Sequence, residues 1–422
     1  MTRTSALSML ISMKVWLKLL IGSLLGIALG LLLPPDNSVV VSALAWLDQL
    51  SIHIGTYAML PTLIFALSVA VFEIRQDNRM WPLVFRSAAI LVLASIVIIG
   101  SGIFITIVFP PARIPILIEG QKESLSLDVG KGILELFPPD MFSALFSGGA
   151  YILPACVFAF FLGAGLSYDR SYSKPVTSLI DSLSRIFYYI AAFFSEILGL
   201  LMIILGAYWA IQFHGAIKAE VFHDLIILLG LWGLVLAFIL LPLFLYLLGP
   251  KTKVWKQLYG AVGPAIAGFF SGNINFTLPV LIRHAKENHG VRRRSSAVTL
   301  AVFANFSRAG SAMVAAMALI VIIKSYSSLG VTTADLFFIF IQALGISFLL
   351  ARHPGDGAYA ALAVLCTSFG RGFEAGYLIL KPLAFYLIAV GTLIDVMVAS
   401  LATYAIGKLS GFQEDKEARH FI

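Results

Sequence analysis

Long apolar runs recur along the chain and alternate with short polar segments. The first six runs cover residues 15–33, 41–72, 81–109, 141–167, 176–211 and 223–248. A helix needs about 20 mainly apolar residues to cross the hydrocarbon core of a bilayer, and each of these runs is about that long or longer. The pattern therefore predicts an all-α, polytopic membrane protein.

After residue 251 the apolar runs become shorter and are interrupted by Gly, Pro and polar residues. One pair of arms surrounds "SGNINFTLP" at 271–279, and a second pair, at 332–348 and 357–368, surrounds "LLARHPGDG". Each arm is too short to cross a hydrocarbon core of about 30 Å alone. Non-helical backbone at membrane depth is tolerated where it is buried in protein or lines a cavity, so we expect two re-entrant helical hairpins.

Two longer runs accompany these hairpins. The run 295–324 is interrupted at "NFSRAGS", and the run 377–409 contains Asp395. We interpret both as broken helices, so that the order is hairpin, broken helix, hairpin, broken helix. Corresponding interrupted segments in two halves of a chain are typical of the inverted repeats that form transporter binding sites. In total, the pattern predicts eight transmembrane helices and two re-entrant hairpins.

The composition agrees with a chain embedded in lipid. Of its 422 residues, 59% are hydrophobic and 12% are charged, whereas a soluble domain is about 25% charged. We therefore expect no separate soluble domain. We interpret 15–33 as a first membrane span and not as a signal peptide, because no A-x-A cleavage pattern follows it.

The basic residues predict the orientation. The net charge is +7. With a cytoplasmic N-terminus, the inner loops and tail hold most of the Lys and Arg residues: Arg75, Arg79, Arg170, Lys174, Lys251, Lys253, Lys256, Arg283, Lys286, Arg292, Arg293, Arg294, Lys408, Lys416 and Arg419. This positive-inside bias predicts a multi-pass protein of the cell inner membrane with both termini in the cytoplasm. The same bias explains the positive net charge, so we expect no nucleic-acid partner.

Motifs of soluble enzymes are not found. The sequence contains no H-E-x-x-H, P-loop, G-x-S-x-G or dinucleotide fingerprint. Cys156 and Cys366 both lie in apolar runs, where we expect small buried residues and not a disulfide or a metal pair. We therefore expect neither an enzyme nor a metal site nor an organic cofactor.

Charged residues inside the apolar runs are candidates for function. Arg308 lies in the middle of a run, where a central Arg costs about 2.5–3.5 kcal/mol on insertion scales. It either forms a buried ion pair or faces a substrate or ion pathway. Asp395 in the last run needs a cation, which a substrate amine, a proton or an Arg could supply.

The two predicted hairpin turns carry further polar residues. Arg352 and Asp356 belong either to a re-entrant tip or to a solvated loop, and the tight turn at Pro354 and its neighbouring glycines favours the tip. Asn273 and Asn275 at the first turn either bind substrate or satisfy the turn backbone. Lys381, before the last helix, is expected to extend to the membrane interface.

Several of these segments resemble one family over nearly the whole chain. "KLLIGSLLGIALGLLL", "AMLPTLIFAL" and "ELFPPDMFSALFSGGAYILPACVFAFFLG" look like the first, second and fourth helices of the glutamate transporter homologues, the dicarboxylate/amino acid:cation symporters. "NFTLPV" resembles the turn of that family's first hairpin. "SRAGS" and "RHPGDGA" stand where the family has N-M-D-G-T and G-V-P-G-A-G-A.

This resemblance implies the inverted-repeat fold of that family and a homotrimer that works as an elevator. Residues 1–250 would then form mainly the scaffold and trimerisation helices, with 81–110 moving together with the transport domain. Residues 251–410 would form the transport core, and 411–422 a cytoplasmic tail. The implied substrate site consists of Asn273, Asn275, Thr277, Arg308, Gly310, Arg352, Pro354, Asp356 and Asp395.

The sequence departs from the family where that family binds sodium. Ser307, Arg308 and Ala309 replace the Asn, Met and Asp of the family motif, followed by Gly310 and Ser311. In the last helix, Asp395 falls on the substrate-amine aspartate. Four other family positions in that helix are changed, and they are Gly391, Val398, Ala402 and Ile406. We therefore treat Ser307, Ala309, Ser311 and Ile406 as degenerate ion-coupling positions.

The remaining charges suggest a functional hypothesis. Arg308 and Arg352 balance Asp356 and Asp395, whereas the family pattern has an excess of carboxylates that sodium neutralises. We hypothesise that Arg308, together with Arg352, takes the electrostatic place of sodium, which puts sodium coupling in doubt. The predicted function is secondary active transport of a small anionic or zwitterionic substrate, an amino acid or a dicarboxylate. The alternative is a homologue that no longer transports and acts as a channel, sensor or scaffold.

Overall fold

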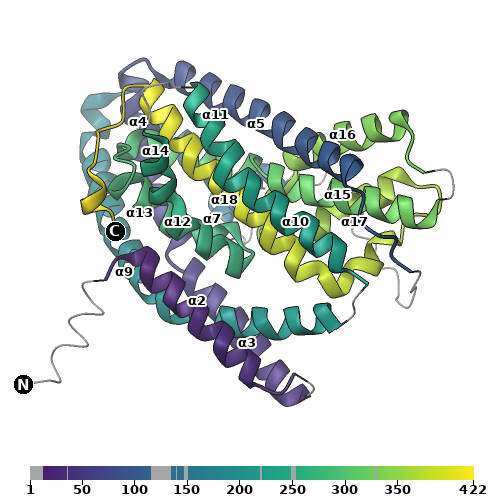
Figure 1. The fold of residues 1–422 in the computed structure, drawn as a ribbon. Coiled ribbons are helices and arrows are strands. Elements are labelled where there is room, and N and C mark those ends of the chain that lie inside the picture. Colours follow the sequence, from purple (N-terminus) through teal and green to yellow (C-terminus); the bar gives the residue numbers. More distant parts are fainter. Residues whose placement is uncertain are drawn as a thin grey trace, which may run out of the picture.

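The described chain is built from α-helices joined by short turns (Figure 1). The computed structural model describes residues 13–35, 37–115, 135–138, 140–146, 151–218, 221–248, 253–327 and 330–422. Within these ranges, extended pairing is limited to an isolated bridge between Val291 and Gln413. The all-α prediction is confirmed.

Seven helical segments of the described chain are long and apolar enough to cross a membrane. They are Val15–Leu32, Ser38–Gln76, Met80–Val108, Ser171–Ile217, His223–Leu248, Arg293–Tyr326 and Gly376–Leu409. Each coincides with a predicted run. The fourth predicted run, 141–167, instead contains the short helices α7 (Ser143–Phe146) and α8 (Leu153–Leu166). The 14 residues of α8 extend about 21 Å, and residues 147–150 lie outside the described part. The predicted eighth span is therefore not among the seven long helices of the described chain.

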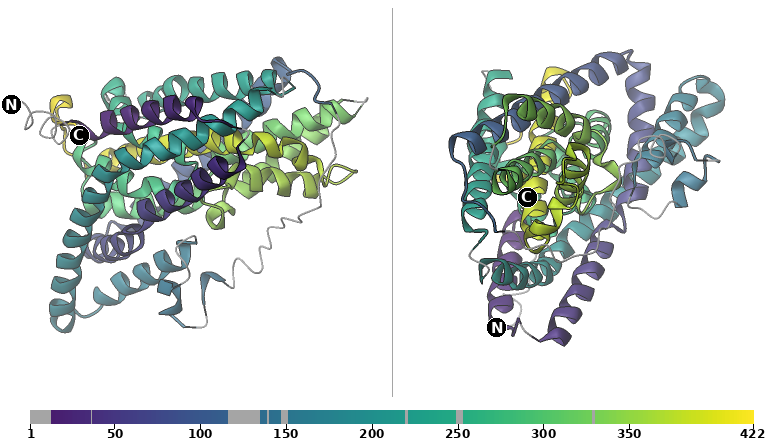
Figure 2. Two further views of the ribbon diagram at one scale, coloured as in Figure 1. Left: turned by 90° about the horizontal axis from the view of Figure 1, so that it is seen from below. Right: turned by 90° about the vertical axis from the view of Figure 1, so that its right-hand side faces the viewer.

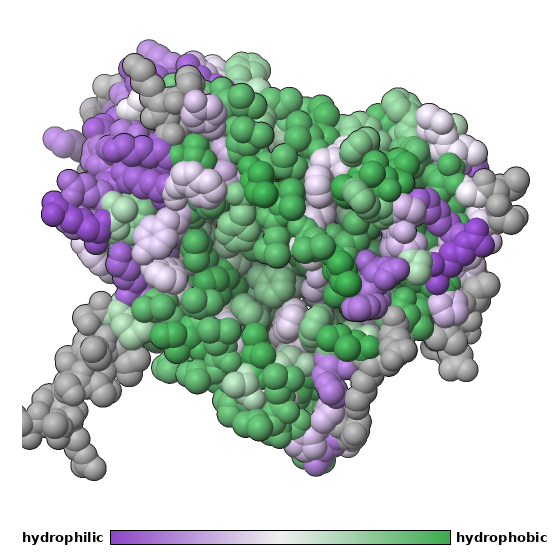
Figure 3. All heavy atoms as spheres, in the orientation of Figure 1, coloured by the Kyte–Doolittle hydropathy of each residue, from purple (hydrophilic) through white to green (hydrophobic). Residues whose placement is uncertain are grey.

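The surface is divided into bands. On the face shown in Figure 3, hydrophilic residues gather at two opposite ends, and an apolar band covers the region between them. Large apolar side chains such as Leu32, Trp81 and Phe104 are exposed on the outer helices. Because an exposed apolar band of this kind is stable against lipid and not against water, the molecule is a polytopic membrane protein.

One group of helices packs around the long helix α9 (Arg170–Lys218), which lies with α2 and α3 along the lower edge of Figure 1. The group consists of α2 (Val15–Leu32), α3 (Ser38–Thr56), α4 (Met59–Gln76) and α8. α2 packs closely along α9, since a Cβ at Gly22 would lie 2.1 Å from the Gly199 carbonyl oxygen. Such small-residue contacts let membrane helices approach each other. We name this set the α9 group.

A second group contains the C-terminal half of the chain. It comprises α5 (Met80–Val108), α10 (His223–Val235), the π-helix η1 (Leu236–Leu240), α11 (Leu241–Leu248) and helices α12 to α18. Its green and yellow helices lie side by side in both views of Figure 2. In the span Arg293–Tyr326, 94% of the most apolar window is buried, compared with 33% for Val15–Leu32. We name this set the core group.

The core group contains two pairs of helices at the positions of the predicted hairpins. The first pairs α12 (Val254–Ser271) with α13 (Ile274–Glu287), and its turn is reduced to Gly272 and Asn273. Gly272 has a left-handed φ of +58°, which glycine adopts without strain. The second pairs α16 (Thr333–Ser347) with α17 (Gly357–Phe369) through the short 3₁₀ helix η2 (Leu350–Arg352). These arms are about 20–27 Å long.

Of the two predicted broken helices, one is broken and the other is not. α14 (Arg293–Phe306) and α15 (Ala309–Tyr326) are separated at Ser307 and Arg308. α18, in contrast, runs without interruption from Ala384 to Leu409, through Asp395. The predicted break at Asp395 is therefore wrong. A single buried Asp leaves the helical backbone intact when its carboxylate finds partners on other elements. The irregular part lies earlier, in the 3₁₀ segment η3 (Gly376–Leu383).

The C-terminal segment 410–422 folds back along one end of the core group. Phe412 is buried, and its carbonyl oxygen accepts a hydrogen bond of 2.8 Å from the Arg292 backbone N–H. Further along, after the short 3₁₀ helix η4 (Ala418–His420), Phe421 stacks on Tyr259 of α12 at 5.8 Å. These contacts make 410–422 a packed segment of the protein.

Candidate functional site

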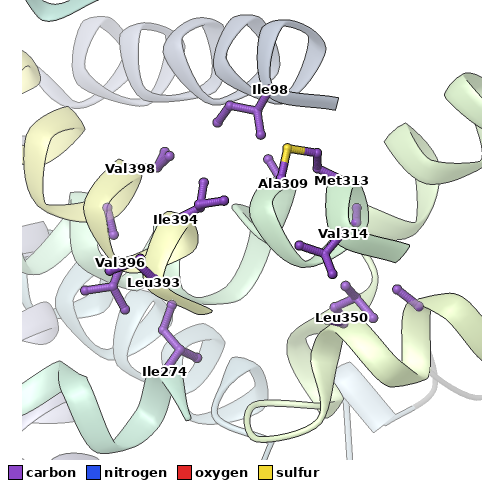
Figure 4. Packing of buried hydrophobic residues seen from close by; sticks show 14 of the residues in the cluster. Ile98, Ile274, Ala309, Met313, Val314, Leu350, Leu393, Ile394, Val396 and Val398 are labelled. Carbon is purple, nitrogen blue, oxygen red and sulfur yellow. The ribbon is translucent and has the colours of Figure 1, made fainter. Parts of the chain in front are cut away.

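An ion pair lies in the centre of the core group, between the break of α14–α15 and the middle of α18. Arg308 Nε is 3.2 Å from Asp395 Oδ2, and both side chains are fully buried. Apolar side chains surround this region, including Ile98 of α5, Met313 of α15 and Ile394 of α18 (Figure 4). In such surroundings an ion pair is little screened by solvent, so the two charges depend strongly on each other.

The Asp395 carboxylate is also held by the first turn of α15. Oδ1 accepts hydrogen bonds from the backbone N–H groups of Gly310, at 2.7 Å, and Ser311, at 3.4 Å. Oδ2 accepts a bond of 2.6 Å from the Ser311 hydroxyl. The amides at a helix N-terminus carry partial positive charge, so they stabilise a carboxylate there. The break at Ser307 and Arg308 therefore creates the binding position for Asp395.

The Arg308 side chain reaches from this break to the second hairpin. Its Nη2 donates to the carbonyl oxygens of His353, at 3.2 Å, and Pro354, at 3.5 Å. Nε is close to Asp395 but is not aligned for a hydrogen bond, and Nη1 has no acceptor among the described residues. The adjacent Ser307 hydroxyl is likewise buried without a partner there. Unsatisfied buried polar atoms are rare in proteins and indicate a place for a polar ligand or an ordered water.

The two hairpin turns meet next to this ion pair. The Ile274 N–H donates to the Pro354 carbonyl oxygen at 3.0 Å, which joins the first turn to the second. The Thr392 hydroxyl of α18 donates to the Gly272 carbonyl oxygen at 3.1 Å. A Cβ at Gly355 would lie 3.0 Å from Asn273 Nδ2. The turns and α18 together cover the ion pair, so it is closed off in this conformation.

The predicted residues of the first hairpin lie at this meeting point. Asn273 is the N-cap of α13, where its Oδ1 accepts hydrogen bonds from the backbone N–H groups of Asn275, at 2.9 Å, and Phe276, at 3.3 Å. Asn275 and Thr277 are buried in the first turn of α13, and the Thr277 hydroxyl bonds to the Ile274 carbonyl oxygen. Asn273 therefore satisfies turn backbone, which was one of its two expected roles.

The second hairpin turn separates its charged residues. Arg352 forms a salt bridge of 2.8 Å with Glu135, a residue that sequence reasoning missed. Asp356 is half exposed and lies 3.1 Å from His353 Nδ1, within electrostatic reach of Arg308. Of the two candidate cations, only Arg308 reaches Asp395 in the described structure.

Two glycines make room for the Arg308 guanidinium and for Ser311, which holds Asp395. A Cβ at Gly357 would lie 2.4 Å from Arg308 Nη2, and a Cβ at Gly391 would lie 2.9 Å from Ser311 Cα. Ala309 and Gly310 are buried at the start of α15, where a Cβ on Gly310 would meet the Gly391 carbonyl oxygen at 2.6 Å. The Gly357 role was missed, because "PGDG" indicates a turn but not what packs on it.

The other family positions of α18 lie away from the ion pair. Val398 and Ala402 line a small apolar cavity of about 20 Å³ against α5 and α11. Ile406 is buried eleven residues beyond Asp395, which is about 16 Å along the helix axis. Among the described residues, no three or more His, Cys, Asp or Glu side chains lie together in a group that could hold a metal ion.

Comparison with known proteins identifies relatives. Residues 15–409 match the family described as the Sodium:dicarboxylate symporter family. Excitatory amino acid transporter 1 of Rattus norvegicus is 26% identical over 225 residues, which is 53% of this chain and 40% of that protein. The Mus musculus protein gives the same values, and the Homo sapiens protein is also 26% identical, with 41% of its length covered. The aligned part thus spans less than half the length of these relatives. Because the family match covers nearly the whole chain, this protein belongs to the Sodium:dicarboxylate symporter family.

Proposed function

We propose that the protein is a secondary active transporter of a small amino acid or dicarboxylate. The observation that carries this proposal is the buried pair of Arg308 and Asp395, placed where two hairpin turns and a helix break meet. Ionisable residues inside a membrane protein are costly and usually mark a substrate or ion pathway. Membership of a symporter family supports the same conclusion.

The chemistry of the pair suits a substrate with opposite charges. The unpartnered Nη1 of Arg308 can donate to a carboxylate, and Asp395 can accept from an ammonium group. An α-amino acid carries both groups. Its carboxylate can take the place of Asp395 as the partner of Arg308, and its ammonium group can take the place of Arg308 as the partner of Asp395. Val398, in its apolar cavity, supplies no cation for a second carboxylate. A zwitterionic amino acid is therefore the preferred substrate class within this proposal.

The same pair argues against strict sodium coupling. Arg308 carries a permanent positive charge next to Asp395, so the pair is neutral without an added cation. The substitution Arg308→Met would leave Asp395 as an uncompensated carboxylate. Uptake by that variant is expected to become dependent on sodium or on protons, whereas uptake by the unaltered protein is not.

The arrangement of the two helix groups supports an elevator mechanism. The α9 group forms the static scaffold, and the core group carries the ion pair. α10, η1 and α11 pack mainly on α18, so we assign 223–248 to the moving unit together with α5. The division expected from the sequence placed residues 1–250 mainly in the scaffold, with 81–110 moving. We propose that 223–248 also belongs to the moving unit. A homotrimer held together through the scaffold, as in the family resemblance, completes the proposal.

The membrane placement follows from the same geometry. The hairpins α12–α13 and α16–α17 come from opposite ends of the molecule and turn back near the ion pair, which supports the proposal that both are re-entrant. Arginines and lysines gather at the end where 410–422 packs: Lys256, Arg283, Lys286, Arg292, Arg293 and Arg294. By the positive-inside rule, we place this end on the cytoplasmic side of the cell inner membrane, with both termini on that side.

Uptake into proteoliposomes tests the proposal. A thermal-shift screen of the purified protein against amino acids and dicarboxylates would first select ligands. Labelled ligand uptake would then be measured with sodium and with sodium replaced by choline. Uptake that persists in choline supports the proposal, and a strict sodium requirement overturns its coupling part. If no ligand shifts the unfolding temperature and no uptake occurs, the transport proposal fails and a channel, sensor or scaffold role is favoured.

A further inference from the structure

A basic pocket lies at the joint between the two helix groups. It has a volume of about 250 Å³, and it lies between α9 on one side and α13 and α14 on the other. The polar residues that carry the argument are Ser184, Arg185 and Tyr188 of α9, Lys286 of α13, and Arg293 and Ser296 of α14. Three of these side chains are cations, and no carboxylate lines the pocket.

The two arginines of this pocket share one carboxylate. Asp181 lies 3.1 Å from Arg185 and 2.5 Å from Arg293, and Arg293 also donates to the Ser184 hydroxyl at 3.2 Å. A more distant contact of 3.5 Å joins Arg293 to Glu73. These contacts fix the guanidinium groups and use only part of the five N–H donors of each, so further donors remain for a ligand.

Lys286 carries a charge that no described carboxylate neutralises at ion-pair distance. Its ammonium group lies 3.8 Å from the centre of the Tyr188 ring, in a cation–π contact. The nearby Glu287 is occupied by other partners, because it accepts a hydrogen bond of 2.5 Å from the Tyr188 hydroxyl and lies 3.4 Å from Arg283. The pocket therefore offers an ammonium group and two arginines to an anion.

The surroundings of the pocket are apolar and exposed. Ile282 of α13 lines it, and Ile186, Tyr189 and Phe193 are exposed on the adjacent face of α9. The pocket lies at the basic end of the molecule, next to Arg292 and Arg294. Basic pockets between membrane helices at the cytoplasmic side bind the headgroups of acidic lipids. Tyrosines are common at this depth, where one side of the ring is apolar and the other is wet.

We propose that this pocket binds the headgroup phosphate of an anionic phospholipid, with an acyl chain lying on the exposed apolar face of α9. A free phosphate ion would use the same cations but would leave this apolar face without a partner. Because the walls come from both helix groups, a bound lipid bridges them. If the core group moves as proposed above, the lipid favours the conformation described here. That last consequence and the cytoplasmic placement rest on the proposed function, whereas the cations of the pocket and its apolar surroundings do not.

Lipid binding can be measured without transport. The full chain, delipidated in a neutral detergent, would be titrated with short-chain phosphatidylglycerol, short-chain phosphatidylcholine or inorganic phosphate while thermal unfolding is followed. Native mass spectrometry would count bound lipids. Phosphatidylglycerol is expected to raise the unfolding temperature and to form an adduct, whereas phosphatidylcholine and phosphate are not. Equal effects of the two lipids, or full protection by phosphate, would overturn the proposal.

Variants localise the effect. Lys286→Gln and Arg185→Gln each remove one exposed cation, and each is expected to weaken phosphatidylglycerol binding about fivefold. Lys174→Gln serves as the matched control, because Lys174 is exposed on the same helix eleven residues before Arg185 and does not line the pocket. The control is expected to bind as the unaltered protein does. Equal weakening by all three substitutions would show a general charge effect and would refute the site.

Discussion

The buried ion pair gives the sharpest quantitative prediction. At 3.2 Å between Arg308 Nε and Asp395 Oδ2, and with an effective dielectric constant of about 20, the attraction is about 5 kcal/mol. Removing one partner of a buried pair typically costs about 3–5 kcal/mol, because the other charge stays buried without compensation. We therefore expect Arg308→Met and Asp395→Asn each to lower the free energy of unfolding by an amount in that range.

The two single substitutions are not expected to be equal. In Arg308→Met, Asp395 keeps its hydrogen bonds from Gly310 and Ser311, so the cost lies near the lower limit, at about 3 kcal/mol. In Asp395→Asn, Arg308 keeps only its bonds to two carbonyl oxygens, so the cost lies near the upper limit of about 5 kcal/mol. The double variant buries no net charge and is expected to cost clearly less than the sum.

The assay is a double-mutant cycle. The free energy of unfolding would be measured in mixed detergent micelles by titration with a denaturing detergent, followed by tryptophan fluorescence. The coupling energy between the two sites is expected to be about 2–3 kcal/mol. Arg371→Met is the control, since Arg371 forms a pair of 2.8 Å with Asp335 but is 69% exposed, and its loss is expected to cost less than about 1 kcal/mol. Additive costs of Arg308→Met and Asp395→Asn would refute the reasoning.

Three further predictions concern packing. Gly357→Val places a side chain where Arg308 Nη2 lies, so transport should fall at least tenfold in the uptake assay. The control is Gly165→Val, at an open position of α8, which should leave uptake unchanged. Gly22→Leu drives α2 away from the Gly199 backbone and should cost about 1–3 kcal/mol of stability; no shift in the unfolding temperature would contradict the close α2–α9 contact. Phe412→Ala removes a buried ring that lies 4.4 Å from the Arg294 guanidinium, and it should cost about 3–5 kcal/mol. Phe85→Ala, on the exposed surface, is the control for this last change, and equal costs would show that 410–422 contributes no packing.

The sequence by itself determined the membrane class and most helix positions. Runs of apolar residues set the spans because a helix satisfies its own backbone hydrogen bonds in lipid. The turn at Gly272 and the break at Ser307 and Arg308 were also predictable. Glycine and short polar residues act on their own backbone there, so the signal is local. The 141–167 run shows the limit of this reasoning, because its composition is apolar enough for a span while its helix α8 has only 14 residues.

Tertiary structure alone decided which charges meet. Asp395 bonds to Gly310, 85 positions earlier in the chain, and Arg352 bonds to Glu135, 217 positions away. Local sequence carries no information about such distances, since they follow from how whole helices pack. For the same reason, Asp395 was expected to interrupt its helix, whereas its partners on α15 let the helix continue. Sequence identified Arg308 and Asp395 as charges that need compensation, and the packing of α15 against α18 made them compensate each other.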